Sequence, residues 1–283
     1  MTEFHRATSL GQALELLSQE GPTPTIIAGG TDVMVWKNAG NFHPERVIDV
    51  WGVRPQCAGI VDHGDSIGVG AIASYAEIIR NPLVQEHLPV LVEAASEVGA
   101  VQIQNRGTLG GNIGGSSPAG DTLPVLLAYD ASVVLASKEG TREIPYRDYC
   151  TGYRQTVRKS HEMITEVRFP KPSEGTSGSW FKAGTRLAQA ISKVMLAGVG
   201  EVRDGRFEWV RMGIGSVAPV PLLLDQVSGA VSGQAVSDET LEAARKAAHA
   251  QVAPIDDVRS NAEYRRAVAG NMVVRFLRTL AEQ

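Results

Sequence analysis

The segment Thr108–Asp121, which reads TLGGNIGGSSPAGD, concentrates glycine more than any other part of the chain. Between Gly107 and Gly120 six of fourteen residues are glycine, whereas the chain-wide 30 in 283 would place one or two there. Glycine loses more backbone freedom on folding than other residues, so such a cluster is expected where φ must be positive or where another group approaches the backbone closely. Any fold of this chain must accommodate that requirement here.

The flanks of this segment help to decide between two interpretations. A Gly/Ser-rich stretch is most often a flexible surface loop or linker. Here 100–105 (AVQIQN) precedes it and the apolar 123–137 (LPVLLAYDASVVLAS) follows it, and we expect both flanks to be buried. A glycine loop between two buried segments favours a ligand cradle, in which backbone N–H groups turn toward an anion such as phosphate.

A second glycine turn, Ile26–Asp32 (IIAGGTD), shares these features. Both turns follow apolar residues, carry hydroxyl side chains and end at an aspartate. Taken alone, the second turn is equally consistent with a plain strand-to-helix connection. The pair favours two loops that close on one long polar ligand such as a dinucleotide.

A third glycine motif, Gly68-x-Gly70-x-x-Ala73, matches the Rossmann pattern only weakly. Ser74 and Glu77 form a capping box that starts the next helix after the motif, so the two glycines are predicted to lie within a strand. Further capping boxes are predicted at Ser9 with Gln12 and at Ser260 with Glu263.

The order of predicted elements favours an α+β protein of two domains, 1–172 and 178–283. The polar stretch 171–179 (KPSEGTSGS) is the best linker candidate. Strands are expected at 25–27, 46–50, 65–72, 162–170, 179–184, 193–202 and 206–218, and helices at 10–19, 75–80, 83–98, 237–252 and 260–280.

Composition and residue spacing exclude several classes of protein. A net charge of −4 and a pI near 5.9 give no reason to expect nucleic acid or an anionic membrane as partner. The N-terminal residues do not form a secretory signal and no apolar run is long enough for a membrane span, so we expect a cytoplasmic protein. The two cysteines cannot build a Cys₄ metal or iron–sulfur site, the six histidines lack metal-ligand spacing, and no G-x-S-x-G elbow is present. We therefore expect no metal site on this chain.

Lys182 lies in an otherwise apolar predicted strand, SWFKAG. On composition alone, a lysine that extends its ammonium group to the surface is as consistent with this position as a functional residue.

Five segments together resemble the FAD-binding subunit of the molybdenum hydroxylases, the family of xanthine dehydrogenase and carbon monoxide dehydrogenase. In family order they are Ile26–Asp32, 108–131 (TLGGNIGGSSPAGDTLPVLLAYDA), 162–170 (EMITEVRFP), 181–194 (FKAGTRLAQAISKV) and 213–221 (GIGSVAPVP). The resemblance implies an FAD-binding domain of the vanillyl-alcohol-oxidase (PCMH) type, followed by a domain like the C-terminal domain of carbon monoxide dehydrogenase flavoprotein.

The resemblance also implies which residues hold the cofactor. The two glycine loops would bind the pyrophosphate and ribityl chain, with backbone N–H groups around 28–31 and 110–112 at the phosphates. Thr108 and Asp121 match polar contacts, Val98 and Ile164 match apolar contacts, and Lys182 matches a lysine near the isoalloxazine ring. The implied cofactor-binding residues are Ile26, Ile27, Ala28, Gly29, Gly30, Thr31, Asp32, Val33, Val98, Thr108, Gly110, Gly111, Asn112, Ser116, Asp121, Ile164 and Lys182.

In function, the resemblance implies an electron-transfer subunit that passes electrons from a partner [2Fe-2S] subunit through FAD to an acceptor such as NAD. A large molybdopterin subunit would carry out substrate hydroxylation, and the complex would be a dimer of heterotrimers. No residue of this chain is expected to perform the hydroxylation. The FAD is expected to be non-covalent, because neither glycine loop contains His or Cys.

The resemblance does not define the substrate of the whole enzyme. Segments 151–170 and 217–224 look nearer the xanthine dehydrogenase branch, which favours xanthine, another N-heterocycle or an aldehyde. A self-contained flavin oxidase and a non-redox scaffold that keeps the fold are the alternatives.

Overall fold

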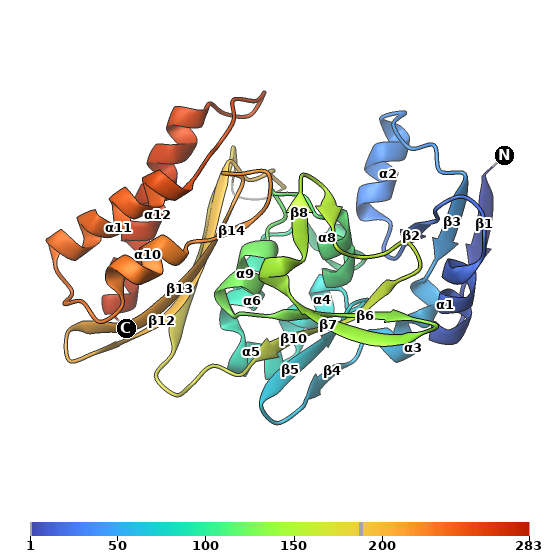
Figure 1. The fold of residues 1–283 in the computed structure, drawn as a ribbon, viewed down its shortest axis with the longest axis horizontal. Helices are drawn as coiled ribbons and strands as arrows, with labels where there is room; N and C mark the ends of the chain where they lie inside the picture. The colour runs from blue at the N-terminus through green and yellow to red at the C-terminus, as the bar shows by residue number, and fades with distance from the viewer. Residues whose placement is uncertain (1, 187–188, 283) are drawn as a thin grey trace.

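The computed structural model describes residues 2–186 and 189–282, which form three units side by side along the longest axis (Figure 1). The first unit is a three-stranded parallel sheet in the order β1-β3-β2, made of β1 (Glu3–Arg6), β3 (Arg46–Asp49) and β2 (Thr25–Ile27). Its helices are α1 (Leu10–Ser18) and α2 (Thr31–Asn38), followed by η1 (Trp51–Val53) and α3 (Arg54–Cys57).

The central unit is an antiparallel five-stranded sheet with a group of helices. The strand order is β4 (Ile60–Asp62), β5 (Ser66–Gly70), β10 (Met163–Pro170), β6 (Ser132–Ser137) and β7 (Gly140–Pro145). Between β5 and β6 the chain forms α4 (Tyr75–Arg80), α5 (Pro82–His87), α6 (Pro89–Ser96), α7 (Val101–Gln104), α8 (Leu109–Gly115) and α9 (Leu123–Ala128). After β7 come η2 (Tyr146–Asp148) and a small hairpin, β8 (Cys150–Gly152) and β9 (Gln155–Thr156).

The third unit is an antiparallel four-stranded sheet covered by helices on its outer face (Figure 1). Its strands are β11 (Ser177–Ala183), β12 (Val194–Arg203), β13 (Arg206–Gly215) and β14 (Leu222–Leu223), and its helices are α10 (Asp225–Val231), α11 (Asp238–Gln251) and α12 (Ala262–Ala281). Glycines let α12 approach closely, since a Cβ at Gly198 would lie 2.6 Å from the Phe276 ring. The inner face packs on α6 and α9 of the central unit.

The hydrophobic core continues from the central unit into the third. Trp180, Met195 and Val199 of β11 and β12 belong to the same buried cluster as the side chains of α6 and α9. The first unit has its own smaller cluster around Ile48 and Leu17, and the third unit has another between its sheet and helices. The central unit is therefore fixed against the third by shared apolar packing.

Most predicted elements are confirmed, including the strand position of Gly68 and Gly70 and the capping box of Ser74 with Glu77. The single helix predicted over 83–98 is wrong, because Pro89 lacks a backbone donor and starts a new helix, α6. The capping box at Ser260 is also wrong, because Asn261 is the N-cap of α12. Ser9 does cap α1, but the Gln12 side chain accepts from Thr8 and not from Ser9.

The prediction that the flank 100–105 is buried is also wrong. This flank forms the short helix α7 at the surface, with Val101 62% exposed, and is not buried. The flank 123–137 is buried as predicted, since every residue of α9 is buried. Of the 181–194 stretch, Leu187 and Ala188 lie outside the described residues.

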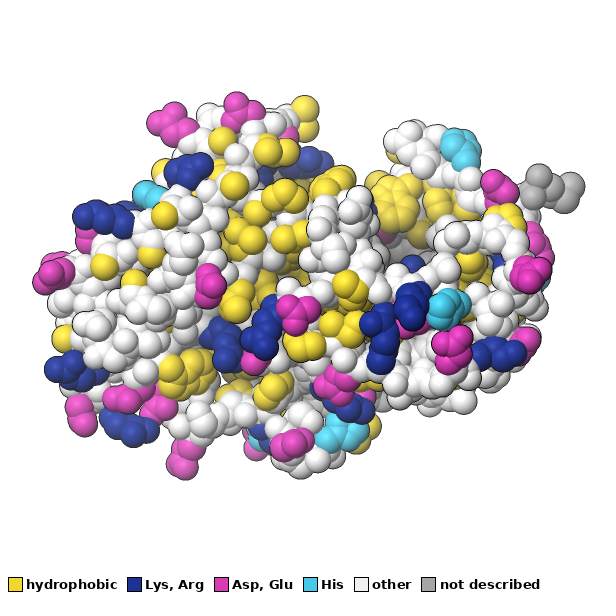
Figure 2. Space-filling model, viewed as in Figure 1, with side chains coloured by type: hydrophobic (Ala, Val, Ile, Leu, Met, Phe, Trp, Pro, Cys, Tyr) yellow, Lys and Arg dark blue, Asp and Glu magenta, His cyan; other side chains and the backbone are white. Residues whose placement is uncertain are grey.

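Two surface properties bear on function. No helix among the described residues is long and apolar enough to cross a lipid bilayer. On the face shown in Figure 2, acidic and basic side chains are interspersed rather than gathered by sign. That distribution agrees with the modest net charge of −4.

Candidate functional site

A cavity of about 510 Å³ lies between the first and central units, and both glycine segments line it. This volume lies within the range of about 300–1,000 Å³ usual for small-molecule and cofactor sites. Of the residues predicted from sequence, those lining it are Ile26, Ile27, Ala28, Gly29, Gly30, Thr31, Asp32, Val33, Val98, Thr108, Gly110, Gly111, Asn112 and Ile164. Two segments more than seventy residues apart therefore share one cavity.

The first glycine turn, Ala28–Thr31, presents unpaired backbone donors. Within the described residues, the N–H groups of Ala28, Gly29, Gly30 and Thr31 have no hydrogen-bond acceptor. Gly30 has φ of 77° and is the N-cap of α2, and no side chain caps that helix. Free N–H groups at a helix start attract anions, so this turn has the donor set for a phosphate.

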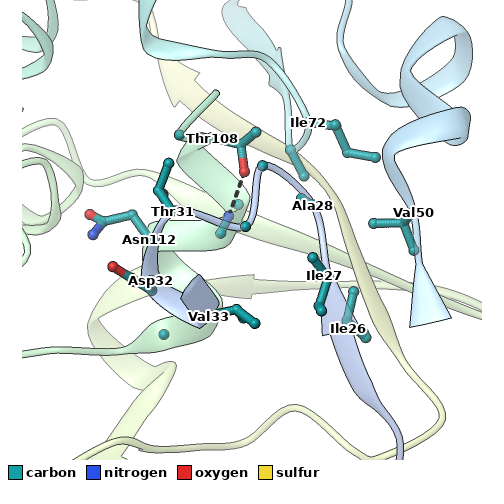
Figure 3. A pocket seen from close by; sticks show the side chains of 18 of the residues that line it. Ile26, Ile27, Ala28, Thr31, Asp32, Val33, Val50, Ile72, Thr108 and Asn112 are labelled. Atoms are coloured by element: carbon teal, nitrogen blue, oxygen red, sulfur yellow. Dashed lines mark hydrogen bonds between the residues drawn. The ribbon is translucent and has the colours of Figure 1, made fainter. Parts of the chain in front are cut away.

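The second glycine segment differs, because its first half forms the helix α8 and not an open loop. Thr108 caps α8 by accepting from the Gly111 N–H at 3.0 Å (Figure 3), and the Asn112 N–H donates to the Thr108 carbonyl at 3.0 Å. The Gly110 N–H donates to the Ala71 carbonyl at 2.8 Å. The resemblance places the N–H groups of 110–112 at the phosphates, and in this structure each of them already has an acceptor in the protein.

The glycines allow the two segments to meet. A Cβ at Gly29 would collide with the backbone carbonyl of Arg106, just before the second segment. A Cβ at Gly110 would lie 2.7 Å from the Ala71 carbonyl oxygen. At Gly114, by contrast, a Cβ would meet only Ile164, at 3.9 Å. Some glycines thus permit close backbone packing, while Gly114 leaves room in the cavity.

Polar and apolar side chains line different parts of the cavity wall. In Figure 3 the side chains of Thr31, Asp32 and Asn112 lie toward one end of the view, while Ile26, Ile27, Val50 and Ile72 lie toward the other. Val98, Met163 and Ile164 add further apolar surface. A cavity with one polar and one apolar part suits a ligand that joins an apolar ring to a phosphate-containing tail.

Asp32 is the acid in this wall. Its carboxylate lies against the end of α8, since a Cβ at Gly115 would be 3.3 Å from Asp32 Oδ2. Water reaches the side chain, yet the surrounding walls remove enough hydration to raise the pKa of Asp32, and the guanidinium of Arg154 partly offsets that rise. Arg154, at the tip of the β8–β9 hairpin, also donates to the Gly115 carbonyl at 3.2 Å and lies over the Trp36 ring. The hairpin therefore ties α8 to α2.

Three predicted residues do not line the cavity: Ser116, Asp121 and Lys182. Ser116 is buried at the C-cap of α8, with φ of 43° and its hydroxyl 3.3 Å from Cys150 Sγ. The side chain of Lys182 is only 8% exposed, which rules out the surface-lysine interpretation, and its ammonium group pairs with Asp121 Oδ2 at 2.8 Å.

Asp121 is tied to the third unit by several bonds. The Ser192 hydroxyl donates to Asp121 Oδ1 at 2.5 Å, and Trp180 Nε1 donates to the Asp121 carbonyl at 3.1 Å. The Ser216 N–H donates to the Pro118 carbonyl at 2.8 Å. Burial raises the pKa of Asp121, and Lys182 and Ser192 act against that rise. The second half of this glycine segment therefore joins the central unit to the third.

Several lining residues were missed from the sequence, among them Trp36, Val50, Tyr75, Ile103, Arg158 and Met163. Trp36 stands one helical turn after Asp32, so helical spacing could have found it. Val50 directly follows β3, which is parallel to β2, and the ends of parallel strands meet at one sheet edge. Tyr75 carried no such signal.

The chain is similar in sequence to known flavoprotein subunits. Residues 1–172 match the family described as "FAD binding domain in molybdopterin dehydrogenase", and residues 179–280 match "CO dehydrogenase flavoprotein C-terminal domain". A nicotinate dehydrogenase FAD-subunit from Eubacterium barkeri is 32% identical over 93% of this chain and 90% of its own length. A xanthine dehydrogenase FAD-binding subunit from Escherichia coli is 28% identical over the same shares, 93% and 90%.

The same likeness holds in three dimensions. A chain of carbon monoxide dehydrogenase from Hydrogenophaga pseudoflava superposes with a TM-score of 0.94 at 31% identity, covering 98% of this chain and 96% of that one. The α+β architecture of an FAD-binding domain followed by a flavoprotein C-terminal domain is thereby confirmed. Relatives from different branches have similar sequence identity to this chain, so the comparisons do not support the predicted preference for the xanthine dehydrogenase branch.

Proposed function

Because this chain belongs to the family of FAD-binding subunits of the molybdenum hydroxylases, and is thus an FAD-dependent oxidoreductase subunit, we propose that its cavity holds FAD non-covalently for electron transfer. When bound, FAD accepts electrons one at a time and releases them as a pair, which joins one-electron and two-electron carriers. The two glycine segments contain neither His nor Cys for covalent attachment.

The observation that carries the proposal is the row of free N–H groups at Ala28–Thr31 beside an apolar wall. These donors would hold the diphosphate at the start of α2, where the helix dipole also favours negative charge. Ile26, Ile27, Val98 and Ile164 would exclude water from the ring. The residues fit the cofactor, since Gly114 leaves open space where a side chain would intrude.

The proposal gives the predicted residues two roles. Those that line the cavity would contact FAD, with Thr108, Gly110, Gly111 and Asn112 forming one wall through α8. Asp121 and Lys182 would act from outside, by fixing the end of the second glycine segment against the third unit. Ser116 would act from outside by ending α8 beside Cys150. The domain division 1–172 and 178–283 is part of the proposal.

The remaining parts concern the whole enzyme. Relatives are named FAD subunits of nicotinate and xanthine dehydrogenases, so they are components of larger enzymes. We propose a [2Fe-2S] subunit and a large molybdopterin subunit as partners, a cytoplasmic dimer of heterotrimers, and NAD or another acceptor. The substrate would be an N-heterocycle or an aldehyde and would bind the large subunit.

An absorption spectrum of the purified chain, taken before and after acid precipitation, tests the proposal. We expect a flavin spectrum, a colourless pellet and released FAD identified by chromatography. Flavin that stays in the pellet would contradict non-covalent binding. A colourless chain that also fails to bind added FAD would overturn the cofactor assignment, and substrate oxidation by this chain alone would overturn its role as a subunit.

A further inference from the structure

The side chain of Tyr75 lines the cavity, and its hydroxyl has no hydrogen-bond partner among the residues that the structure describes. Tyr75 is the first residue of α4 and is 2% exposed. Its side chain lines the cavity, and its hydroxyl oxygen is buried without a donor or acceptor among the described residues. A buried polar group without a partner is unfavourable and is rare in folded proteins, so its partner has to be sought.

The tyrosine is held firmly in place. Its N–H donates to the Gly107 carbonyl at 3.0 Å, and a Cβ at Gly107 would lie 3.2 Å from two atoms of its ring. The preceding residue, Ser74, is the N-cap of α4 and pairs with Thr108 in an isolated bridge. The ring is therefore packed against the residues that lead into α8, and the direction of its hydroxyl is fixed.

No residue within 2–186 or 189–282 supplies the partner. The Thr122 hydroxyl is near enough to influence the pKa of Tyr75, but the two make no hydrogen bond of acceptable geometry, and Thr122 donates to Asn112 Oδ1 at 2.8 Å instead. Burial raises the pKa of Tyr75 well above its usual value, so the hydroxyl stays protonated at neutral pH and remains a donor.

We propose that the Tyr75 hydroxyl donates a hydrogen bond to an oxygen of the FAD bound in this cavity. The inference rests on the proposed function and adds to it a binding residue that the glycine motifs do not contain. The ring of Tyr75 lies against Gly107, which also lines the cavity. Diphosphate and ribityl oxygens are acceptors of the required kind.

Tyr75→Phe tests the proposal because it removes only the hydroxyl. In the FAD-free chain it should leave the melting temperature unchanged or raise it, since an unsatisfied polar group disappears. For FAD, the dissociation constant measured by fluorescence titration of the full chain should rise by about threefold to tenfold, the value of one hydrogen bond. A destabilised FAD-free chain would mean that the hydroxyl already had a partner in the protein, which would overturn the proposal.

Tyr149→Phe is the matched control. The Tyr149 hydroxyl is also buried without a partner in the described part of the chain, but Tyr149 does not line the cavity. This variant should keep the wild-type dissociation constant for FAD. If wild type binds FAD and both variants bind it equally well, the Tyr75 assignment is wrong while the proposed function stands. If wild type itself fails to bind FAD, the proposed function fails first.

Discussion

The two glycine segments resemble each other in sequence and differ in what their glycines do. In Ile26–Asp32 the glycines leave a turn whose backbone donors are free, with Gly30 in the left-handed region. In Thr108–Asp121 they allow α8 to lie directly on the chain around Ala71, and the N–H groups are used within the protein. Glycine content alone therefore does not show which backbone N–H groups stay available to a ligand, whereas the hydrogen bonds of the described residues do.

The second segment is also divided within itself. Its first half forms α8 and lines the cavity, while 118–121 is bonded to residues of β11, to Ser192 and to Ser216 in the third unit. The first segment makes no hydrogen bond to the described residues of the third unit. Changes at 118–121 should therefore weaken the contact with the third unit, which changes in the first segment should leave intact.

The largest expected effect comes from the connection to the third unit. Lys182→Met would leave the Asp121 carboxylate buried without its cation, and removal of one partner from a buried pair costs about 3–5 kcal/mol. Urea unfolding should show this loss in the FAD-free chain. The double variant Asp121→Leu with Lys182→Met removes both charges and should recover much of the stability. A single variant with normal stability but weak FAD binding would show that Lys182 serves the cofactor directly.

Two glycines of α8 offer a comparison within one helix. Gly110→Ala would place a methyl group 2.6 Å from the Ala71 Cβ and should lower the free energy of unfolding by about 1–3 kcal/mol. Gly114→Ala meets only Ile164 at 3.9 Å and should raise it by about 0.5–1 kcal/mol, because alanine favours helix. Chemical denaturation measures both. Equal effects would contradict the assignment of Gly110 to close packing.

The sequence was sufficient to predict several of the strands, the burial of 123–137 and half of the residues that line the cavity. The predicted strands at 46–50 and 162–170 and the residues 26–33 all have local signals, either alternating apolar residues or a glycine turn. Two features had none. Helix α8 contradicts the low helix propensity of glycine and depends on packing against Ala71, and Tyr75 is brought to the cavity by a bridge between Ser74 and Thr108.

The ion pair between Asp121 and Lys182 could not be predicted from the sequence for a similar reason. Sixty-one positions divide them, and only the packing of β11 on the central unit brings their side chains together. A charged residue in an apolar strand is consistent with either a surface position or a buried pair until its neighbours are known. Local sequence patterns do not contain the tertiary contacts between units.

Gly30 offers a test of the first segment alone. Its φ of 77° is unfavourable for side chains, and the only neighbour of a Cβ there is Ile27 at 3.8 Å, so Gly30→Ala should cost about 1–2 kcal/mol from the backbone alone. Gly30→Asn is the matched control, because asparagine tolerates this conformation. Thermal unfolding should rank wild type above Asn and Asn above Ala, and FAD affinity should follow the same order. If the alanine variant matches wild type in melting temperature and in FAD affinity, position 30 does not require a residue that tolerates the left-handed conformation.

The smallest expected effect concerns β10, which supports the wall that both segments share. Glu162 precedes β10 and accepts from Arg142 Nε at 2.6 Å and Nη2 at 2.8 Å, and the hydrogen bond from Arg142 holds the pKa of Glu162 below its usual 4.5. Because the folded-state pKa is depressed, this stabilisation is present above the unfolded pKa and is lost as pH falls through the folded value. Glu162→Gln should therefore be less stable than wild type at neutral pH, by on the order of 1 kcal/mol, and should approach it in acid. Urea unfolding across this pH range measures the difference; a constant gap between the two proteins would show that the Glu162 charge does not support β10.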